Sequence, residues 1–213
     1  MIRVLLVDDH TLVRQALCRL LDSEEDIHVI GQTGSGHEAV SLCKKLQPDI
    51  VILDYALPDL DGLEATRQIA DLKVGARVLI LTMYSNEEYA TRLIRSGAAG
   101  FVVKTASTLE LLTAIRKLTT KGGVYVTPSI MERMVARIGQ PEADAPEANL
   151  SNREMQVLVR LARGAKTREV SRELNLSQST VETYRARVLE KLGLRNNSDI
   201  TRFAIRRGLI ELE

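Results

Sequence analysis

The sequence predicts an α/β domain built on a parallel sheet, followed by a small all-helical domain. Over the first 120 residues, five short runs rich in Val, Ile and Leu alternate with five stretches of helical periodicity. The apolar runs are continuous and do not alternate with polar residues, which is typical of a sheet covered by helices on both faces. The charge also divides the chain: residues 1–149 carry 16 Lys and Arg against 20 Asp and Glu, a net of −4, and residues 150–213 carry 13 against 8, a net of +5.

The elements of the first domain follow from the lengths of these runs. Runs of four to seven apolar residues are too short for helices, so we expect strands at 2–7, 27–31, 50–54, 77–82 and 100–104. The helical patterns between and after them cover 10–21, 36–46, 62–72, 86–96 and 107–119. Strands that alternate with helices indicate βαβ units, and hence a doubly wound, five-stranded parallel sheet. The flavodoxin-like strand order 2-1-3-4-5 would place the first, third, fourth and fifth strands side by side.

The second domain is expected after a linker. Residues 128–138 form a helix or helical arm that begins at Pro128, and residues 139–149 are acidic, contain two prolines and lack large apolar residues. We therefore divide the chain into a domain at 1–120, an arm and linker at 121–149, and a domain at 150–213. In the last, Ser151 and Glu154 form a capping box before an apolar helix, and further helices are expected near 167–174, 178–192 and 198–207.

The composition limits the class of protein. With 45% hydrophobic and 27% charged residues the chain is typical of globular proteins. No run approaches 18 apolar residues and the first residues lack the pattern of a signal peptide, so we expect no membrane association. Cys18 and Cys43 have no metal or disulfide spacing, which fits a reducing cytoplasm. The basic C-terminal part indicates a nucleic-acid partner.

Polar residues end four of the predicted strands. Asp8 and Asp9 follow the first strand, Asp54 the third, Thr82 the fourth and Lys104 the fifth. If the strand order is as expected, they converge where ligands bind in open α/β sheets. Carboxylates brought together repel one another, and burial adds a desolvation cost, so the cluster predicts a divalent cation, best Mg²⁺. Lys104 can balance a phosphoryl group, Thr82 can donate to it, and Asp54 is placed to become an aspartyl-phosphate.

Each residue of this cluster, taken alone, has an ordinary alternative explanation. Strands often end in polar residues, so Asp54 alone would mean little, and the specificity lies in the whole set. The sequence contains no G-x-G-x-x-G after the first strand, no G-x-x-x-x-G-K-[ST] and no H-E-x-x-H. His10, His28 and His37 are scattered, and we interpret them as incidental.

Residues 1–120 resemble the receiver domain of two-component response regulators, through "VLLVDDH", "DIVILDYALPDLDG", "VLILT" and "GFVVKT". The resemblance implies that a sensor histidine kinase phosphorylates Asp54. It also implies a magnesium site in which Asp9 and Asp54 are side-chain ligands and Asp8 supports them. The family's switch pair corresponds here to Thr82 and Phe101.

Residues 150–213 resemble the LuxR-type helix-turn-helix output domain, through "LSNREMQVLVRLARG", "REVSRELNLSQSTVETYRARVLEKLGL" and "AIRRGLI", so that the whole chain resembles the NarL/FixJ class. Ser177 is the expected N-cap of the helix that enters the DNA major groove. The residues expected to contact double-stranded DNA are Thr180, Glu182, Thr183, Arg185, Arg187 and Lys191. Glu182 and Tyr184 depart from the family's usual Lys and His, and Thr167 becomes the N-cap candidate of the preceding helix.

Three functions are compatible with these residues. The first is a transcription regulator in which phosphorylation controls DNA binding and homodimerisation, with the output-domain contact around Ile200, Phe203 and Ala204. The second is a magnesium-dependent phosphatase or phosphotransferase, which Ala56 disfavours because such enzymes place an acid two residues after the nucleophile. The third is a phosphorylation-regulated protein-interaction module with weakened DNA binding, which Glu182 keeps open. We expect the first, and no enzymatic activity beyond the chain's own phosphorylation and dephosphorylation.

Overall fold

The computed structural model describes residues 1–60, 62–82, 87–121, 123–136, 146, 150–174, 176–207 and 209–210. The chain forms two compact units, residues 1–138 and residues 139–213. The predicted linker at 139–149 lies outside the described residues except for Pro146. No helix in the described part of the chain combines the length and the apolar character needed to cross a membrane.

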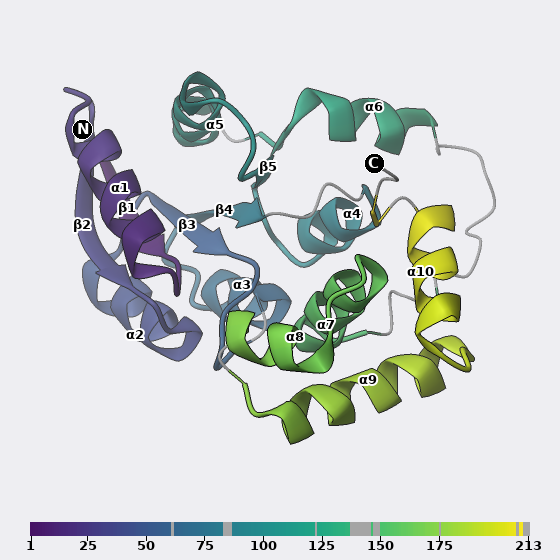
Figure 1. Ribbon diagram of the computed structural model, residues 1–213. Helices are drawn as coiled ribbons and strands as arrows, with labels where there is room; N and C mark the ends of the chain where they lie inside the picture. The colour runs from purple at the N-terminus through teal and green to yellow at the C-terminus, as the bar shows by residue number, and fades with distance from the viewer. Residues whose placement is uncertain are drawn as a thin grey trace. The chain divides into compact units, whose positions relative to one another are not determined.

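Among the described residues, the first unit contains one parallel sheet with the strand order β2-β1-β3-β4-β5-β6. Figure 1 labels β1 to β5 of this sheet. Its strands are β1 (Ile2–Val7), β2 (Ile27–Thr33), β3 (Ile50–Asp54), β4 (Arg77–Thr82), β5 (Gly100–Val103) and β6 (Tyr125–Val126). The flavodoxin-like order is confirmed, but the expected number of five strands is wrong because β6 extends the sheet beside β5. A strand of two residues is too short to leave a period in the sequence.

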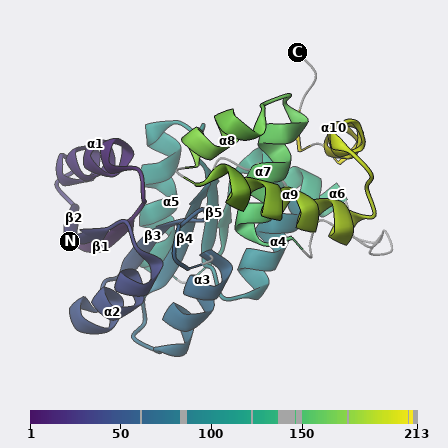
Figure 2. The same cartoon turned by 60° about the horizontal axis from the view of Figure 1, so that its bottom comes forward.

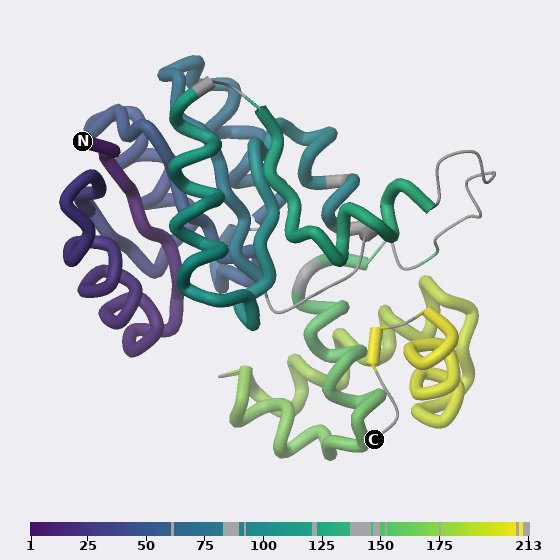
Figure 3. The backbone as a smooth tube through the Cα atoms, turned by 90° about the horizontal axis from the view of Figure 1, so that it is seen from above, coloured from purple at the N-terminus to yellow at the C-terminus, as the bar shows by residue number. Residues whose placement is uncertain are grey.

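Helices cover both faces of this sheet. They are α1 (Thr11–Asp22), α2 (Gly36–Leu46), α3 (Gly62–Asp71), α4 (Glu87–Arg95), α5 (Thr108–Lys121) and α6 (Pro128–Ala136). Figures 1 and 3 show α1 and α5 on one face, and α2, α3 and α4 on the other. α6 packs against α4 and therefore belongs to the first unit.

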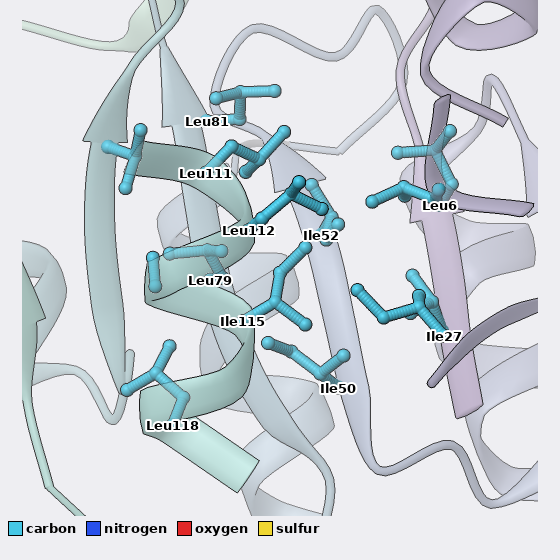
Figure 4. Close-up of a cluster of buried hydrophobic side chains, with 14 of the residues drawn as sticks. Leu6, Ile27, Ile50, Ile52, Leu79, Leu81, Leu111, Leu112, Ile115 and Leu118 are labelled. Carbon is cyan, nitrogen blue, oxygen red and sulfur yellow. The ribbon is translucent and has the colours of Figure 1, made fainter. Parts of the chain in front are cut away.

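The core lies between the sheet and α5 (Figure 4). Alternate strand residues point to this face because successive side chains of a strand point to opposite sides. The cluster includes Val4, Leu6, Ile50, Ile52, Leu79 and Leu81 from the strands, and Leu111, Leu112, Ile115 and Leu118 from α5. Burying one such side chain contributes about 1.5–3 kcal/mol, so this cluster contributes strongly to the packing of α5 against the sheet.

In the part of the second unit that the structure describes, the expected bundle of four helices is present: α7 (Asn152–Ala162), α8 (Thr167–Glu173), α9 (Gln178–Leu192) and α10 (Asn197–Arg206), drawn in green to yellow in Figure 2. The capping box is confirmed: Ser151 N–H donates to Glu154 Oε2 at 2.7 Å, and Glu154 N–H donates to Ser151 Oγ at 3.3 Å. Ser177 also caps α9 as expected, since its Oγ accepts from Thr180 N–H at 3.0 Å.

The structure corrects the expected N-cap of α8. Lys166 occupies this position, and its N–H donates to Glu169 Oε2 at 2.7 Å. Thr167 is the first helical residue, and its hydroxyl donates to Glu182 Oε1 of α9 at 2.7 Å. Thr is a residue type favoured at N-caps, which is why the sequence indicated Thr167. In the structure its hydroxyl instead donates to a side chain of another helix.

The structure also contradicts the expected output-domain dimer contact. Ile200, Phe203 and Ala204 are 0%, 7% and 0% exposed, and α10 packs against α7 of the same unit. The apolar face of α10 is therefore used in the core of its own unit and is not available to a second copy. An apolar helix face has the same periodicity whether it packs within its own unit or against a second copy of the chain. The sequence alone therefore led us to expect a dimer contact here.

Candidate metal centre and nucleic-acid interface

The polar residues that end β1, β3 and β5 meet at one edge of the sheet. One carboxylate oxygen each from Asp8, Asp9 and Asp54, with a ring nitrogen of His10, lie within 4.8 Å of one another. Asp8 and Asp54 are almost fully buried, and Asp9 is partly exposed. The parallel register brings them together, because β1 and β3 are neighbours and end at the same edge.

Lys104 closes the cluster on its inner side. Its Nζ lies 2.7 Å from Asp8 Oδ2 and 2.7 Å from Asp54 Oδ2, and its side chain is 12% exposed. Burial lowers the pKa of Lys104, but the charges of Asp54 and Asp8 outweigh burial and raise that pKa above its ordinary value. The ammonium group therefore stays charged between the two carboxylates.

One ammonium does not balance three carboxylates. Burial raises the pKa of Asp54, the Lys104 ammonium lowers it without fully offsetting burial, and the charge of Asp8 raises it further. With Asp8, Asp9 and Asp54 ionised and Lys104 charged, the site has a net charge of −2. Oxygen ligands and a negative charge fit a hard divalent cation, which prefers carboxylates and water.

His10 belongs to this site, so our interpretation of it as incidental is wrong. Its N–H donates to Asp8 Oδ1 at 2.8 Å, and its Nδ1 lies 2.8 Å from Asp9 Oδ1. Asp9 Oδ1 is buried, and His10 satisfies it with a hydrogen bond only when Nδ1 carries the proton. The signal in the sequence was its position directly after the Asp8-Asp9 pair.

The two predicted switch residues lie on neighbouring strands but in different environments. Thr82 is the last residue of β4, is 2% exposed, and its carbonyl oxygen accepts from Lys104 N–H at 2.6 Å. It therefore stands at the same edge as the carboxylates. Phe101 of β5 is fully buried and is paired with Ile80 of β4 and Val126 of β6. Its neighbour Val102 belongs to the cluster under α5, so Phe101 is buried on the opposite face of the sheet.

The segment after Asp54 is held close to it. Ala56 N–H donates to Asp54 Oδ1 at 3.1 Å, while Lys104 binds the other oxygen. Both oxygens of Asp54 thus have a defined partner, and the carboxylate has a fixed orientation. Sequence reasoning missed Asp59 in the same segment, whose contacts run to α2 over more than 20 residues.

In the second unit, α9 presents a polar stripe to solvent. Ser179, Thr180, Thr183, Tyr184 and Arg187 line a hollow of about 330 Å³. Val181 and Val188 are fully buried, and they orient the helix so that this stripe stays outside. Hydroxyl groups and an arginine on one exposed helix face are suited to contacts with DNA phosphates and base edges.

Three of the predicted DNA contacts, Glu182, Arg185 and Lys191, have partners on other helices of the unit. Arg185 Nε donates to Asn197 Oδ1 at 2.7 Å, and its guanidinium lies 3.6 Å from Glu182 Oε2. Glu182 is half-exposed and accepts from Thr167. Lys191 Nζ lies 2.7 Å from Glu154 Oε2, the buried carboxylate of the capping box. These contacts tie α9 to α7, α8 and α10.

Two family models match separate parts of this chain. The model of the response regulator receiver domain matches residues 4–116, which include the acidic cluster and Lys104. The model of the bacterial regulatory proteins of the luxR family matches residues 148–204, which include α7, α8 and α9. Each match lies within one of the two units described above.

Relatives match the chain over its full length. Response regulator UvrY of Escherichia coli is 37% identical over 100% of this chain and 98% of its own length, and response regulator GacA of Pseudomonas aeruginosa is 36% identical over 99% of each chain. The crystal structure of a LuxR-family two-component response regulator from Aurantimonas is 33% identical and covers 65% of this chain and 98% of its own, with a TM-score of 0.62. This chain belongs to the NarL/FixJ class of two-component response regulators, which join a receiver domain to a LuxR-type helix-turn-helix domain.

Proposed function

We propose that this response regulator is switched by phosphorylation of Asp54 and regulates transcription by binding DNA through α9. In this proposal residues 1–120 are the receiver, 121–149 the arm and linker, and 150–213 the DNA-binding domain. The observation that carries the proposal is the buried Lys104 ammonium, 2.7 Å from both Asp8 and Asp54, in a site that still has an excess of negative charge.

The proposed chemistry combines attack by the Asp54 carboxylate with stabilisation of the charge on the transferred phosphoryl group. A carboxylate oxygen of Asp54 attacks the phosphorus atom of a phosphohistidine on the sensor kinase, and the bond to the histidine nitrogen breaks. Lys104 lies beside this carboxylate and neutralises charge on the transferred group, and the Thr82 hydroxyl donates to one of its oxygens. Asp8, Asp9 and Asp54 would hold Mg²⁺, which would supply the remaining positive charge.

Asp54→Asn tests the phosphorylation step. Incubation of the full chain with Mg²⁺ and a small phosphodonor is expected to add one phosphoryl group of mass to the wild type and none to the variant, measured on the intact protein. Asp49→Asn is the matched control, since Asp49 lies just before β3 and accepts from Arg3 N–H at 2.7 Å, away from the cluster. Equal phosphate uptake by Asp54→Asn and the wild type would refute the assignment.

For DNA binding, the proposed contacts are Thr180, Glu182, Thr183, Arg185, Arg187 and Lys191. The exposed side chains of Thr183 and Arg187 support this role most directly, because both line the hollow on α9. We propose that the active form is a homodimer in the cytoplasm, since a two-fold symmetric protein matches paired DNA half-sites. We propose no enzymatic activity beyond the chain's own phosphorylation and dephosphorylation.

A second candidate is a phosphorylation-regulated module with weakened DNA binding. It is favoured by the two exposed carboxylates of α9, Glu182 and Glu190, and by the internal partners of Arg185 and Lys191. Selection from random duplexes at low salt, with and without phosphodonor, separates the two candidates. Recovery of a common sequence motif supports the regulator of transcription, and the absence of affinity for any duplex supports the interaction module.

A further inference from the structure

The segment between β3 and α3 is fastened to α2 by one carboxylate. Asp59 Oδ2 accepts from Ser35 Oγ at 2.6 Å and from His37 N–H at 3.2 Å, and Asp59 Oδ1 accepts from Gly36 N–H at 2.9 Å. Burial alone would raise the pKa of Asp59, but these three donors outweigh burial and hold the pKa below its ordinary value. Asp59 therefore binds the first turn of α2 as an ionised side chain.

The packing around these hydrogen bonds leaves little freedom. A Cβ atom on Gly36 would lie 2.7 Å from Leu60 Cβ and 3.2 Å from Leu57 Cδ1, so α2 lies directly against the segment that carries Asp59. A Cβ atom on Gly62 would lie 2.7 Å from the carbonyl oxygen of Tyr55, the residue after Asp54. Gly62, at the end of this segment, therefore lies against Tyr55 at its start, and Leu57 and Leu60 lie against Gly36 at the start of α2.

The start of α2 is in turn attached to the other half of the acidic cluster. Asp8 N–H donates to the carbonyl oxygen of Thr33 at 3.1 Å, two residues before Ser35. A Cβ atom on Gly34 would lie 3.4 Å from Asp9 Cα, so the loop before α2 is in contact with the Asp8-Asp9 backbone. Asp59 therefore connects the segment that follows Asp54 with the loop that supports Asp8 and Asp9.

We propose that Asp59 is a positioning residue that sets the separation between Asp54 and the Asp8-Asp9 pair for cation binding and phosphoryl transfer. The three carboxylates repel one another, and a frame that resists this repulsion keeps them at the spacing a cation needs. Asp59 contacts neither the carboxylates nor Lys104 in any hydrogen bond or ion pair found among the described residues. The proposal rests on the phosphoryl-transfer function proposed above.

Asp59→Ala in the full chain tests the proposal, with cation affinity and phosphorylation rate as the two measurements. Mg²⁺ binding is measured by titration calorimetry, and the rate by intact mass with a small phosphodonor, both below the onset of thermal unfolding. Loss of a side chain that hydrogen-bonds a metal ligand directly typically weakens metal affinity or activity by about 10- to 100-fold. Asp59 acts through the backbone instead, so we expect the low end of this range, about tenfold, in both measurements. Asp59→Asn, whose amide oxygen still accepts from Gly36 N–H, is expected to lie between Asp59→Ala and the wild type.

Asp22→Ala is the matched control. Asp22 also accepts a backbone hydrogen bond, from Val29 N–H at 2.9 Å, but it joins α1 to β2 at the end of α1 that is remote from Asp8 and Asp9. The Mg²⁺ affinity and the phosphorylation rate of this variant are expected to lie within twofold of the wild-type values. Equal losses in Asp22→Ala and Asp59→Ala would show a general effect of stability and would overturn the proposal.

The remaining outcomes also test the role of Asp59, and they separate it from the proposed function. Wild-type cation affinity and rate in Asp59→Ala would overturn the positioning role and leave the proposed function intact. A wild type that binds Mg²⁺ but accepts no phosphoryl group would refute the proposed function, while the cation affinities would still decide on Asp59. If Asp59→Ala does not fold, Asp59→Asn takes its place: a folded Asn variant with weakened Mg²⁺ binding supports the proposal, and one with unchanged binding overturns it.

Discussion

Lys104→Met removes the ammonium group that pairs with both buried carboxylates, Asp8 and Asp54, while it keeps the approximate length and the apolar stem of the side chain. In the wild type, Lys104 Nζ lies 2.7 Å from one oxygen of Asp8 and from one of Asp54. The side chains of the two acids are 2% and 4% exposed, so water cannot replace the ammonium group without opening the edge of the sheet. The substitution should therefore destabilise the receiver in the absence of a cation.

The magnitude follows from these distances. Each pair at 2.7 Å attracts by about 6 kcal/mol at an effective dielectric constant near 20. Most of this attraction is offset in the wild type by the desolvation of three ions and by repulsion between Asp8 and Asp54. Removal of one partner from a buried ion pair costs about 3–5 kcal/mol, which we take as the expected loss of unfolding free energy at neutral pH.

The pH dependence has a definite sign. Burial already raises the pKa of Asp54, and loss of the Lys104 charge raises it further. A carboxyl group with a raised pKa in the folded state binds its proton more tightly than in the unfolded chain, so folding becomes less favourable as the pH rises through that range. The deficit of Lys104→Met should thus be largest at neutral pH and shrink as the pH falls toward 4.

Calorimetric unfolding of the full chain measures the deficit, with the receiver transition assigned separately because the two units need not unfold together. Asp54→Asn provides the internal control: in this background one carboxylate is already neutral, and Lys104→Met should cost much less. Millimolar Mg²⁺ should restore stability to Lys104→Met more than to the wild type. A deficit below about 1 kcal/mol, or an equal deficit in the Asp54→Asn background, would refute the assigned role of Lys104.

Two predictions concern the second unit. Burial raises the pKa of Glu154, but Lys191 and the backbone of Ser151 outweigh burial and lower it, so this carboxylate stabilises the fold above the unfolded pKa of 4.5 and less as the pH falls through the folded value. Lys191→Met should weaken this dependence, and an unchanged stability profile between pH 3 and pH 6 would contradict it. Glu182→Lys should strengthen non-specific DNA binding and steepen the slope of log affinity against log salt by about 0.9, for one added phosphate contact. An unchanged slope would mean that residue 182 does not face the phosphates.

The alternation of strands and helices was predictable from short-range properties. Strand length, continuous apolar runs and caps such as Ser151 and Ser177 act within a few residues, and the structure agrees with them almost everywhere. The acidic cluster was also predictable, because the ends of parallel strands meet at one edge and the residue types at those ends were visible. Topology thereby turned four separate positions in the sequence into one site.

The partners of individual side chains depend on contacts that no local pattern contains. Lys191 binds a carboxylate 37 residues away, and Asp59 binds α2 over 22 to 24 residues. The sequence does not show whether the charge of a long side chain is paired with another residue. The pairing of Lys191 with Glu154 depends on the packing of α7 against α9.

What the sequence by itself determined is the order of the elements and the carboxylates that they assemble, since both depend on periodicity or on strand ends. The class of the protein followed from the resemblance of its motifs to known families. Only the tertiary structure decided that Phe203 faces the core, that Thr167 holds Glu182, and that His10 joins the acidic cluster. The physical reason is that an apolar face, a hydroxyl or an imidazole can satisfy itself with several partners. Which of them is reached depends on the three-dimensional packing of segments far apart in the chain.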